Sequence, residues 1–371
     1  MKVIVIGAGA SGVVAAINYK RHHKSDDVLI IEHLDKPLKK ILATGNGKCN
    51  LGNANIDYSR FNNPEFAKKI ISCYDYKDLF DSISIQTKMI DDYAYPVSES
   101  AVSVRDALLN ECRKLAIKIN VSEEFIDYNC GTEITVKTDK KAYTCDKLIV
   151  SGGLYSSPKL GSDGSVLKVM EKHGYKVNKP QPGLSPMYTI EKTKDIDGVR
   201  VKALVSILKN GKLIHNEFGE VLFKDRGLSG IVIYNAMSII SREPGLKYNI
   251  VLDLLPDFDS NYLTQYRTNH TFNEFLQAFL NPKISSYLKD RFVNENAIFK
   301  SIKSLFFTFD KSYGFDFSQV SVGGIDINEI DENMMSKHEN NVYFIGELLD
   351  VDGPCGGYNL TWAFATAMRI K

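Results

Sequence analysis

The segment from residue 3 to residue 12 constrains the fold of this chain more than any other. An apolar run, Val3–Ile6, leads directly into three glycines spaced Gly-x-Gly-x-x-Gly, and an apolar helical pattern follows. In such a strand–turn–helix unit Gly7 permits the tight turn, Gly9 lets the backbone approach a pyrophosphate, and Gly12 lets the helix pack closely on the strand. The free N–H groups at the start of the helix then point at the phosphates. The segment therefore predicts a parallel α/β sheet that binds a dinucleotide.

An acidic residue follows at the distance that this interpretation requires. Glu32 ends the next apolar strand, Val28–Ile31, about 20 residues after the last glycine, where a carboxylate can hold ribose hydroxyls, and His33 comes next. One alternative is a secretory signal, because Lys2 precedes the apolar run. The interrupting glycines and the strand that follows argue against it. The other alternative, a glycine turn with a purely structural role, leaves the agreement of strand, helix and acid unexplained.

Length and composition indicate a globular protein with more than one domain. At 371 residues the chain exceeds the ~150 residues of an average domain, which predicts two or three domains. Apolar residues make up 44% and charged residues 25%, and no apolar run reaches the ~20 residues of a membrane helix. The net charge of +1 gives no reason to expect a nucleic acid or a membrane as partner. We expect a cytoplasmic protein with a small-molecule substrate, and the sequence carries no signal for its oligomeric state.

Cysteine and histidine spacing indicates neither disulfides nor a metal site. The six cysteines are dispersed without a CxxC pair, and the seven histidines show no HExxH spacing. Only Cys49 and Cys355 lie in glycine-rich loops, and the other cysteines are expected to be small buried residues. We therefore predict no bound metal and no dithiol centre.

The segment Lys39–Asn50 is rich in glycine, small residues and lysine, and we interpret it as an ordered loop without regular structure. Backbone N–H groups freed by Gly45 and Gly47, together with Lys40 and Lys48, suit a phosphate or the electron-rich edge of a ring. The alternative interpretation is a solvated basic loop.

Helices and strands alternate along the rest of the chain. Helices are predicted over residues 63–80, 104–115, 166–173 and, with breaks, 261–292, and strands over residues 134–138, 142–145, 147–150, 201–208, 212–215 and 220–223. The strand 147–150 is continuously apolar, as in parallel sheets, and runs into Gly152 and Gly153. We expect this second glycine turn beside the first, although a plain turn is the alternative.

Three closely spaced prolines, Pro180, Pro182 and Pro186, interrupt the chain, and the sequence pattern changes beyond them. We therefore predict a first domain segment over residues 1–186, an inserted domain over residues 187–319, and a return to the first domain over residues 320–371.

The C-terminal segment distinguishes FAD from NAD. A strand, Val342–Ile345, ends in Gly346 and Glu347, and a glycine-rich stretch leads into a last helix predicted over residues 358–370. A nicotinamide dehydrogenase needs only the first glycine motif. Glu347 can hold ribityl hydroxyls, and the N-terminus of the last helix can face the pyrimidine side of an isoalloxazine, where the reduced ring is negative. Together the two ends of the chain predict one bound FAD.

Several motifs resemble those of one flavoprotein family. They are Lys40-Ile41-Leu42 to Gly47-Lys48-Cys49-Asn50, Tyr95-Pro96-Val97-Ser98, Gly152-Gly153 to Gly161-Ser162, Gly227-Leu228-Ser229-Gly230, Gly323-Gly324, Gly346 to Pro354, and Gly356-Gly357-Tyr358-Asn359-Leu360. On these motifs the chain resembles the BaiN-like family of NAD(P)/FAD-dependent oxidoreductases, also described as aminoacetone-oxidase-type, over nearly its whole length. The resemblance implies an α/β fold, with a glutathione-reductase-type FAD-binding Rossmann domain interrupted by an inserted domain that is part β-barrel-like and part helical.

The chain also departs from the pattern of that family. The departures are Leu38-Lys39-Lys40 for Gly-Arg-Lys, Lys48 for Arg, Cys355 for Thr, and Lys224 and Ile231 for Thr and Pro in the inserted domain. Lysine keeps the charge of arginine without its planar fork, so phosphate contacts are expected to be weaker. The substrate specificity of the family is therefore not transferred to this chain.

We predict an FAD-dependent oxidoreductase whose flavin takes hydride from NAD(P)H or a small substrate and passes electrons to an acceptor that the sequence does not name. No residue stands out as general acid or base. The predicted FAD contacts are Gly7, Gly9, Ala10, Ser11, Gly12, Glu32, His33, Lys40, Gly47, Lys48, Cys49, Asn50, Gly152, Gly153, Gly346, Glu347, Gly356, Gly357, Tyr358, Asn359 and Leu360. Two other classes stay open: an NAD-dependent dehydrogenase without flavin, and a flavin-binding sensor or structural protein without turnover.

Overall fold

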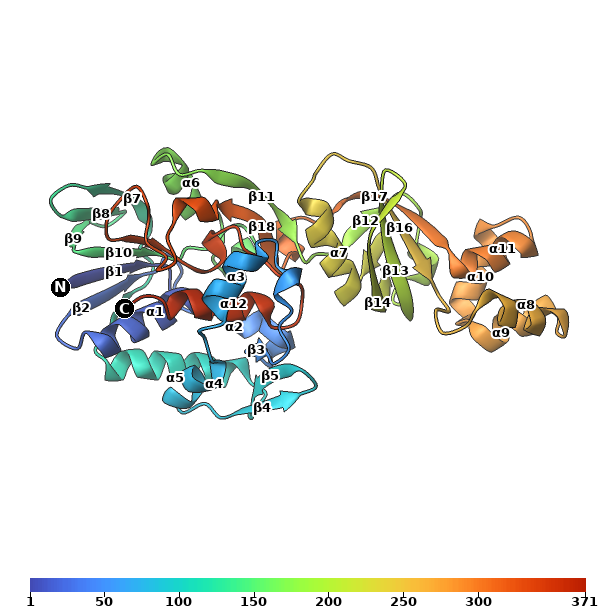
Figure 1. Ribbon diagram of the computed structural model, residues 1–371, viewed down its shortest axis with the longest axis horizontal. Helices are drawn as coiled ribbons and strands as arrows, with labels where there is room; N and C mark the ends of the chain where they lie inside the picture. Colours follow the sequence, from blue (N-terminus) through green and yellow to red (C-terminus); the bar gives the residue numbers. More distant parts are fainter. The chain divides into compact units, whose positions relative to one another are not determined.

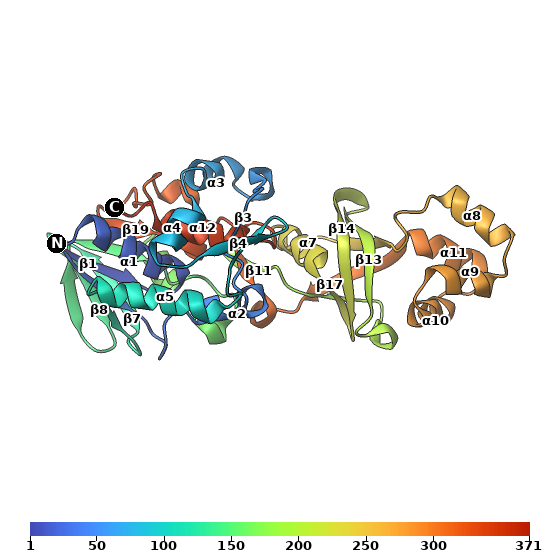
Figure 2. The same cartoon turned by 90° about the horizontal axis from the view of Figure 1, so that it is seen from below.

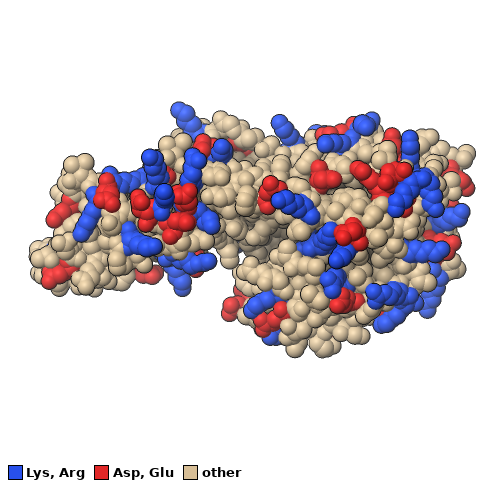
Figure 3. Space-filling model, turned by 180° about the vertical axis from the view of Figure 1, so that it is seen from behind, with Lys and Arg blue, Asp and Glu red and all other residues tan.

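The computed structural model describes all 371 residues, which form two compact units. Unit 1 contains residues 1–181 and 319–371, and unit 2 contains residues 182–318 (Figure 1). The sequence places the corresponding boundaries after residues 186 and 319. No helix in the structure combines the length and the apolar character that crossing a membrane requires. Positive and negative side chains are interspersed over the surface shown in Figure 3, in keeping with the net charge of +1.

A five-stranded parallel sheet forms the centre of unit 1. Its strands, in spatial order, are β19 (Val342–Phe344), β10 (Lys147–Val150), β1 (Lys2–Ile6), β2 (Asp27–Ile31) and β6 (Lys118–Asn120). The central strand is an apolar run with Val3–Ile6 at most 3% exposed, because helices and loops cover both faces of a parallel sheet. Ile6 pairs with Ile31 on one side and with Val150 on the other, so the carboxyl ends of these strands reach the same edge.

Helix α1 (Ala10–His22) runs from that edge back along the sheet. Its residues 11 to 19 are all buried, as expected for a helix that is covered on every side. It packs against β2 and against two further helices, α5 (Ala101–Lys114) and α12 (Tyr358–Ala367), which Figures 1 and 2 show beside it. The first and last helices of unit 1 are therefore neighbours.

The remaining elements of unit 1 surround this core. They are α2 (Lys39–Ala43), α3 (Pro64–Ile71), α4 (Tyr76–Ser82), α6 (Ser165–Lys172), the antiparallel sheet of β3 (Gly52–Asn53), β5 (Tyr93–Pro96) and β4 (Thr87–Ile90), the meander of β7 (Phe125–Cys130), β8 (Ile134–Thr138) and β9 (Ala142–Cys145), and the pair β11 (Val177–Gly183) and β18 (Val320–Ile325).

The structure corrects two predictions of local structure in unit 1. The predicted loop Lys39–Asn50 begins with helix α2, and the part after Ala43 is irregular, with left-handed backbone angles at Gly45 and Asn46. The predicted single helix over residues 63–80 is two helices, because the Asp75 side chain accepts a hydrogen bond from the Lys77 N–H at 2.7 Å and so starts α4.

Unit 2 consists of a closed barrel and a group of helices. The barrel strands, in spatial order, are β12 (Met187–Thr189), β15 (Gly227–Ser229), β14 (Lys212–Lys224), β13 (Arg200–Lys209), β16 (Tyr248–Asp253) and β17 (Leu305–Ser312). The helices are α7 (Ile231–Ser241), α8 (Ser260–Thr268), α9 (Phe272–Phe279), α10 (Pro282–Arg291) and α11 (Glu295–Lys303). The predicted strand 220–223 is the end of the long strand β14. A barrel-plus-helix insertion in an α/β domain is the predicted fold class, which is thereby confirmed.

Candidate functional site

Three glycine turns meet at the carboxyl edge of the parallel sheet, after β1, β10 and β19. The Ser151 hydroxyl, at the end of β10, donates to the carbonyl oxygen of Ile6 at 2.7 Å and lies 3.0 Å from that of Gly7. A Cβ atom added to Gly346, which follows β19, would lie 2.4 Å from the Ser11 Oγ atom in α1. The first and last glycine motifs of the sequence are therefore in direct contact, and the second turn lies beside the first as predicted.

The glycines of the first motif have different surroundings. A Cβ atom on Gly12 would lie 2.1 Å from the carbonyl oxygen of Gly7, so only glycine lets α1 approach the strand this closely. A Cβ atom on Gly9 would have no protein atom within 4 Å. Gly9 is the N-cap of α1, and neither a capping side chain nor an acidic residue occupies this helix end. The open space at Gly9 and the positive end of the helix dipole together suit an anion.

Glu32 lies beside this helix end with its carboxylate already oriented. One carboxylate oxygen accepts the N–H of Ala8 at 2.7 Å, and the other accepts the N–H of Leu34 at 2.9 Å. Each carboxylate oxygen keeps a further lone pair, which a ribose hydroxyl can use. His33 is half-buried, and a Cβ atom on Gly161 would lie 3.7 Å from its Nε2 atom.

Lys40 and Glu347, which the sequence predicts as separate ligands, form an ion pair of 2.6 Å between Nζ and Oε2. The Lys40 ammonium also donates to the hydroxyls of Ser156 at 2.7 Å and Ser162 at 3.2 Å, which uses all three of its hydrogens. The other Glu347 oxygen accepts from the Ser156 hydroxyl at 2.5 Å and from the Ser321 N–H at 2.9 Å. This cluster ties four segments of unit 1 together. Sequence reasoning missed the two serines beside Lys40, although they lie in the segment that resembles the family.

The loop after α2 has an unusual backbone. Gly45, Asn46, Gly47 and Cys49 all have positive φ values, of 55°, 54°, 85° and 62°. Two of these residues are not glycine, and residues held in this region concentrate at binding sites, where the surrounding structure holds them in place. A Cβ atom on Gly47 would have no protein atom within 4 Å, so the loop is open on that side.

Three side chains of this loop are buried or have partners within the protein. Cys49 is fully buried, and burial raises the pKa of its thiol to about 11, so the thiol stays protonated at neutral pH. The Lys48 ammonium pairs with the Glu99 carboxylate at 2.7 Å. The Asn50 side chain accepts the N–H of Gly52 at 3.2 Å. The predicted contacts of this loop with a ligand are therefore left mainly to its backbone and to the Asn50 amide nitrogen, which the bond to Gly52 does not use.

The turn before α12 is held from several sides. Gly357 has a φ of 90°, and a Cβ atom there would lie 2.6 Å from the carbonyl group of Gly52. Asn359 bridges the N–H and the carbonyl oxygen of Gly353, at 3.0 and 2.9 Å. The buried Tyr358 accepts the N–H of Asp57 at 3.1 Å, and Leu360 packs on the core. These side chains fix the turn, so the predicted contact of this turn with a flavin is left to the backbone N–H groups of α12.

Two residues of α12 that sequence reasoning missed hold the third glycine turn. The indole of Trp362 donates to the carbonyl oxygen of Gly346 at 3.0 Å, and the hydroxyl of Thr366 accepts the N–H of Gly346 at 3.0 Å. The one signal in the sequence is that the single tryptophan of the chain lies in this helix.

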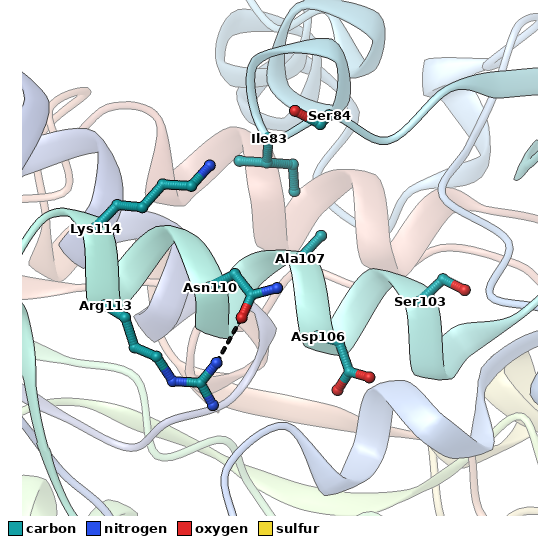
Figure 4. Close-up of a pocket in the computed structure, with 8 residues that line it drawn as sticks. All are labelled: Ile83, Ser84, Ser103, Asp106, Ala107, Asn110, Arg113 and Lys114. Carbon is teal, nitrogen blue, oxygen red and sulfur yellow. Dashed lines mark hydrogen bonds between the residues drawn. The ribbon is translucent and has the colours of Figure 1, made fainter.

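A pocket of about 530 Å³ lies along α5, and Figure 4 shows its eight lining residues, among them Asp106, Asn110 and Arg113. None of the predicted site residues lines it, so it is separate from the glycine turns.

Three comparisons place the chain among known proteins. The family model described as HI0933-like protein Rossmann domain matches residues 1–370. A 3-dehydro-bile acid delta(4,6)-reductase of Clostridium scindens is 30% identical, over 98% of this chain and 97% of its own length. A ribosomal RNA dihydrouridine synthase of Escherichia coli is 27% identical, over 98% of this chain and 95% of its own length. The open conformation of a flavocytochrome c3 fumarate reductase has a TM-score of 0.52 at 11% identity, covering 100% of this chain and 77% of that one.

The structural likeness shows a shared fold. The family match and the reductase relative confirm the predicted enzyme class, an FAD-dependent oxidoreductase.

Proposed function

We propose that this chain, which belongs to the HI0933-like protein Rossmann family, uses FAD to reduce a carbon–carbon double bond conjugated to a carbonyl group. Its membership confirms the family that the sequence motifs indicated. The names of the two relatives support the reaction. A delta(4,6)-reductase of a 3-dehydro compound and a dihydrouridine synthase both add hydrogen to a ring double bond that is conjugated to a carbonyl group.

The observation that carries the proposal is the contact between the first and last glycine motifs, Gly346 against Ser11. This contact brings the two segments proposed for the halves of a dinucleotide site to one sheet edge. The open α1 terminus at Gly9 would hold the pyrophosphate, and Glu32 the adenosine ribose. Glu347 would lie beside the ribityl chain, and the terminus of α12 beside the ring.

The residues present therefore fit FAD. Gly9 and Gly47 border open space, whereas Gly12 and Gly357 are packed so closely that only glycine fits. When bound, FAD supplies a carrier that accepts a hydride from one molecule and gives it to another. We propose NAD(P)H as the first of these molecules. It would visit the flavin transiently, because the chain has no second complete Gly-x-Gly-x-x-Gly motif.

The first test is the absorption spectrum of the purified protein. We expect a yellow protein, or a colourless one that becomes yellow with added FAD. Anaerobic NADPH or NADH should bleach the flavin, and an enone such as cyclohexenone should restore its colour. A preparation that cannot be reconstituted with FAD contradicts the proposal. So does a reduced flavin whose rate of reoxidation in buffer is not increased by any enone.

The second test separates cofactor binding from folding. Gly9→Ala should lower the melting temperature of the apoprotein only slightly, because its Cβ meets no protein atom and the one cost is that alanine is a poorer N-cap than glycine. The same Cβ fills the space proposed for the pyrophosphate, so FAD affinity should fall at least tenfold, or about 1.4 kcal/mol. Gly131→Ala, in the exposed β7–β8 turn, is the matched control and should change neither quantity. Unchanged FAD affinity in Gly9→Ala would refute the placement.

A further inference from the structure

Two tyrosines of strand β5, Tyr93 and Tyr95, lie on the same face of the small β3–β5–β4 sheet. Successive residues of a strand point to opposite faces, and here Ala94 and Pro96 are buried while Tyr93 and Tyr95 are half-exposed. Figures 1 and 2 show this sheet near α12, which packs against β3.

Each of these rings rests on a glycine of one of the two loops proposed for the flavin. A Cβ atom on Gly356, before α12, would lie 2.9 Å from Cε1 and 3.5 Å from the hydroxyl oxygen of Tyr93. A Cβ atom on Gly45 would lie 3.5 Å from Cε1 of Tyr95. The turn at Gly356 is also anchored to this sheet, because Asn53 in β3 donates to its carbonyl oxygen at 3.0 Å. Strand β5 thus lies where the two loops converge.

The hydroxyl groups of Tyr93 and Tyr95 make no hydrogen bond within the protein, in contrast to those of Tyr19 and Tyr143 in the same unit. Tyr19 and Tyr143 donate to the carboxylates of Asp26 and Glu123, each at 2.7 Å. Burial, followed by the neighbouring Tyr95 and Asp92, raises the pKa of Tyr93 above its usual value. The Tyr93 phenol is therefore protonated at neutral pH and free to donate.

We propose that Tyr93 is the catalytic acid of this site and gives the proton that completes reduction of the double bond. The proposal rests on the proposed function, since it assigns a residue to that reaction. Tyr93 is chosen over Tyr95 because it contacts the turn that begins α12, where the flavin ring would lie. A positioned acid of this kind contributes about a hundredfold or more to the rate of a proton transfer.

The chemical step balances with these groups. A hydride adds to the β-carbon of the enone, and the electrons of the double bond move onto the carbonyl oxygen. The O–H bond of Tyr93 breaks as its proton goes to the α-carbon, and the phenolate takes a proton from water. The substrate gains one hydride and one proton, and the two electrons come from NAD(P)H through the cofactor.

The kinetic test follows the two half-reactions separately in the FAD-loaded protein. In Tyr93→Phe, bleaching of the flavin by NADPH should keep the wild-type rate, whereas reoxidation by cyclohexenone should slow about a hundredfold. Tyr95→Phe should slow reoxidation by cyclohexenone far less. Tyr76→Phe is the matched control, because the Tyr76 hydroxyl lies against the sulfur of Met89 at 3.2 Å and should have no effect.

A second measurement does not depend on turnover. Tetranitromethane should nitrate Tyr93 in the apoprotein, and FAD with cyclohexanone should protect it, as read by mass spectrometry. Tyr262, which is 47% exposed in unit 2, should be nitrated equally in both states.

The outcomes distinguish the two proposals. A wild-type flavin that cyclohexenone does not reoxidise overturns the proposed function and this inference with it. If cyclohexenone does reoxidise the wild-type flavin, three results overturn the assignment of Tyr93 alone. They are an unimpaired rate in Tyr93→Phe, a larger loss of rate in Tyr95→Phe, and no protection of Tyr93 from nitration.

Discussion

The two halves of the candidate site are built in different ways. The half around α1 comes from one continuous stretch, residues 3–32, and its closest contact joins Gly12 to Gly7, five positions apart. The half around α12 is assembled from distant segments, and there Gly357 packs on Gly52 and Gly346 on Ser11. In the first half, the residues that form the site also pack in the core of the sheet. In the second half, the geometry of the site depends on contacts between segments far apart in the chain and on those of Trp362 and Thr366 with Gly346.

The largest effect is expected from Gly12→Val, which attacks the continuous half. The new Cβ would lie 2.1 Å from the carbonyl oxygen of Gly7 and 2.4 Å from the Ser151 hydroxyl, so α1 must move off the sheet. We expect a loss of about 3 kcal/mol in the free energy of unfolding of unit 1, and no retained FAD. Urea unfolding measures this, with Gly9→Ala as the control. A variant as stable as wild type would show that the two halves do not differ in this way.

A smaller effect on folding is expected from Gly357→Ala in the assembled half. Alanine is strained at a φ of 90°, and its Cβ would lie 2.6 Å from the Gly52 carbonyl. The free energy of unfolding should fall by about 2 kcal/mol, and FAD affinity by tenfold or more, while ADP affinity stays unchanged. Gly174→Ala, at a φ of 84° and without a close neighbour, measures the cost of a positive φ without the clash. Equal losses of ADP and FAD affinity would contradict the division of the site.

Lys40→Met tests the cluster that joins the segments. It removes the cation from Glu347 and the donor from two serine hydroxyls. Since the two charged side chains are 30% and 23% exposed, we expect a loss of about 1 kcal/mol in the free energy of unfolding. Lys39→Met is the control, because Lys39 pairs with Asp35, which is 64% exposed, and the change should be close to zero. Equal losses in the free energy of unfolding for both variants would mean that the cluster does not hold the segments together.

The smallest effect is expected at Glu99, on the surface beside the assembled half. Hydrogen bonds from Lys48 and Lys88 lower the pKa of this carboxyl from 4.5 to about 2. A lowered pKa in the folded state adds stability above the unfolded pKa, and this stability is lost as the pH falls through the folded pKa. Melting temperatures between pH 4.5 and 2 should therefore fall more steeply for wild type than for Glu99→Gln. Parallel curves would show that the two lysines do not stabilise the folded carboxylate.

Much of the fold could be predicted from the sequence, because apolar runs and turn residues act over a few positions. Strands β8, β9 and β10 have the predicted bounds, and β1 and β2 differ by one residue. The helix break at Asp75 was missed because a capping side chain competes with an apolar pattern that continues through it. The assignment of Lys40 and Glu347 as separate ligands did not foresee their mutual ion pair, since the two residues are 307 positions apart.

The sequence by itself determined the parallel sheet, the glycine turns at its edge and the family. A glycine motif acts locally, because it specifies the backbone conformation of its own residues. The tertiary structure alone decided which side chains share the site. Lys40 meets Glu347 in a sheet where β19, β10 and β1 lie side by side, and Tyr93 meets Gly356 because α12 packs against β3 beside β5. Both arrangements depend on the packing of the whole unit and not on any one segment.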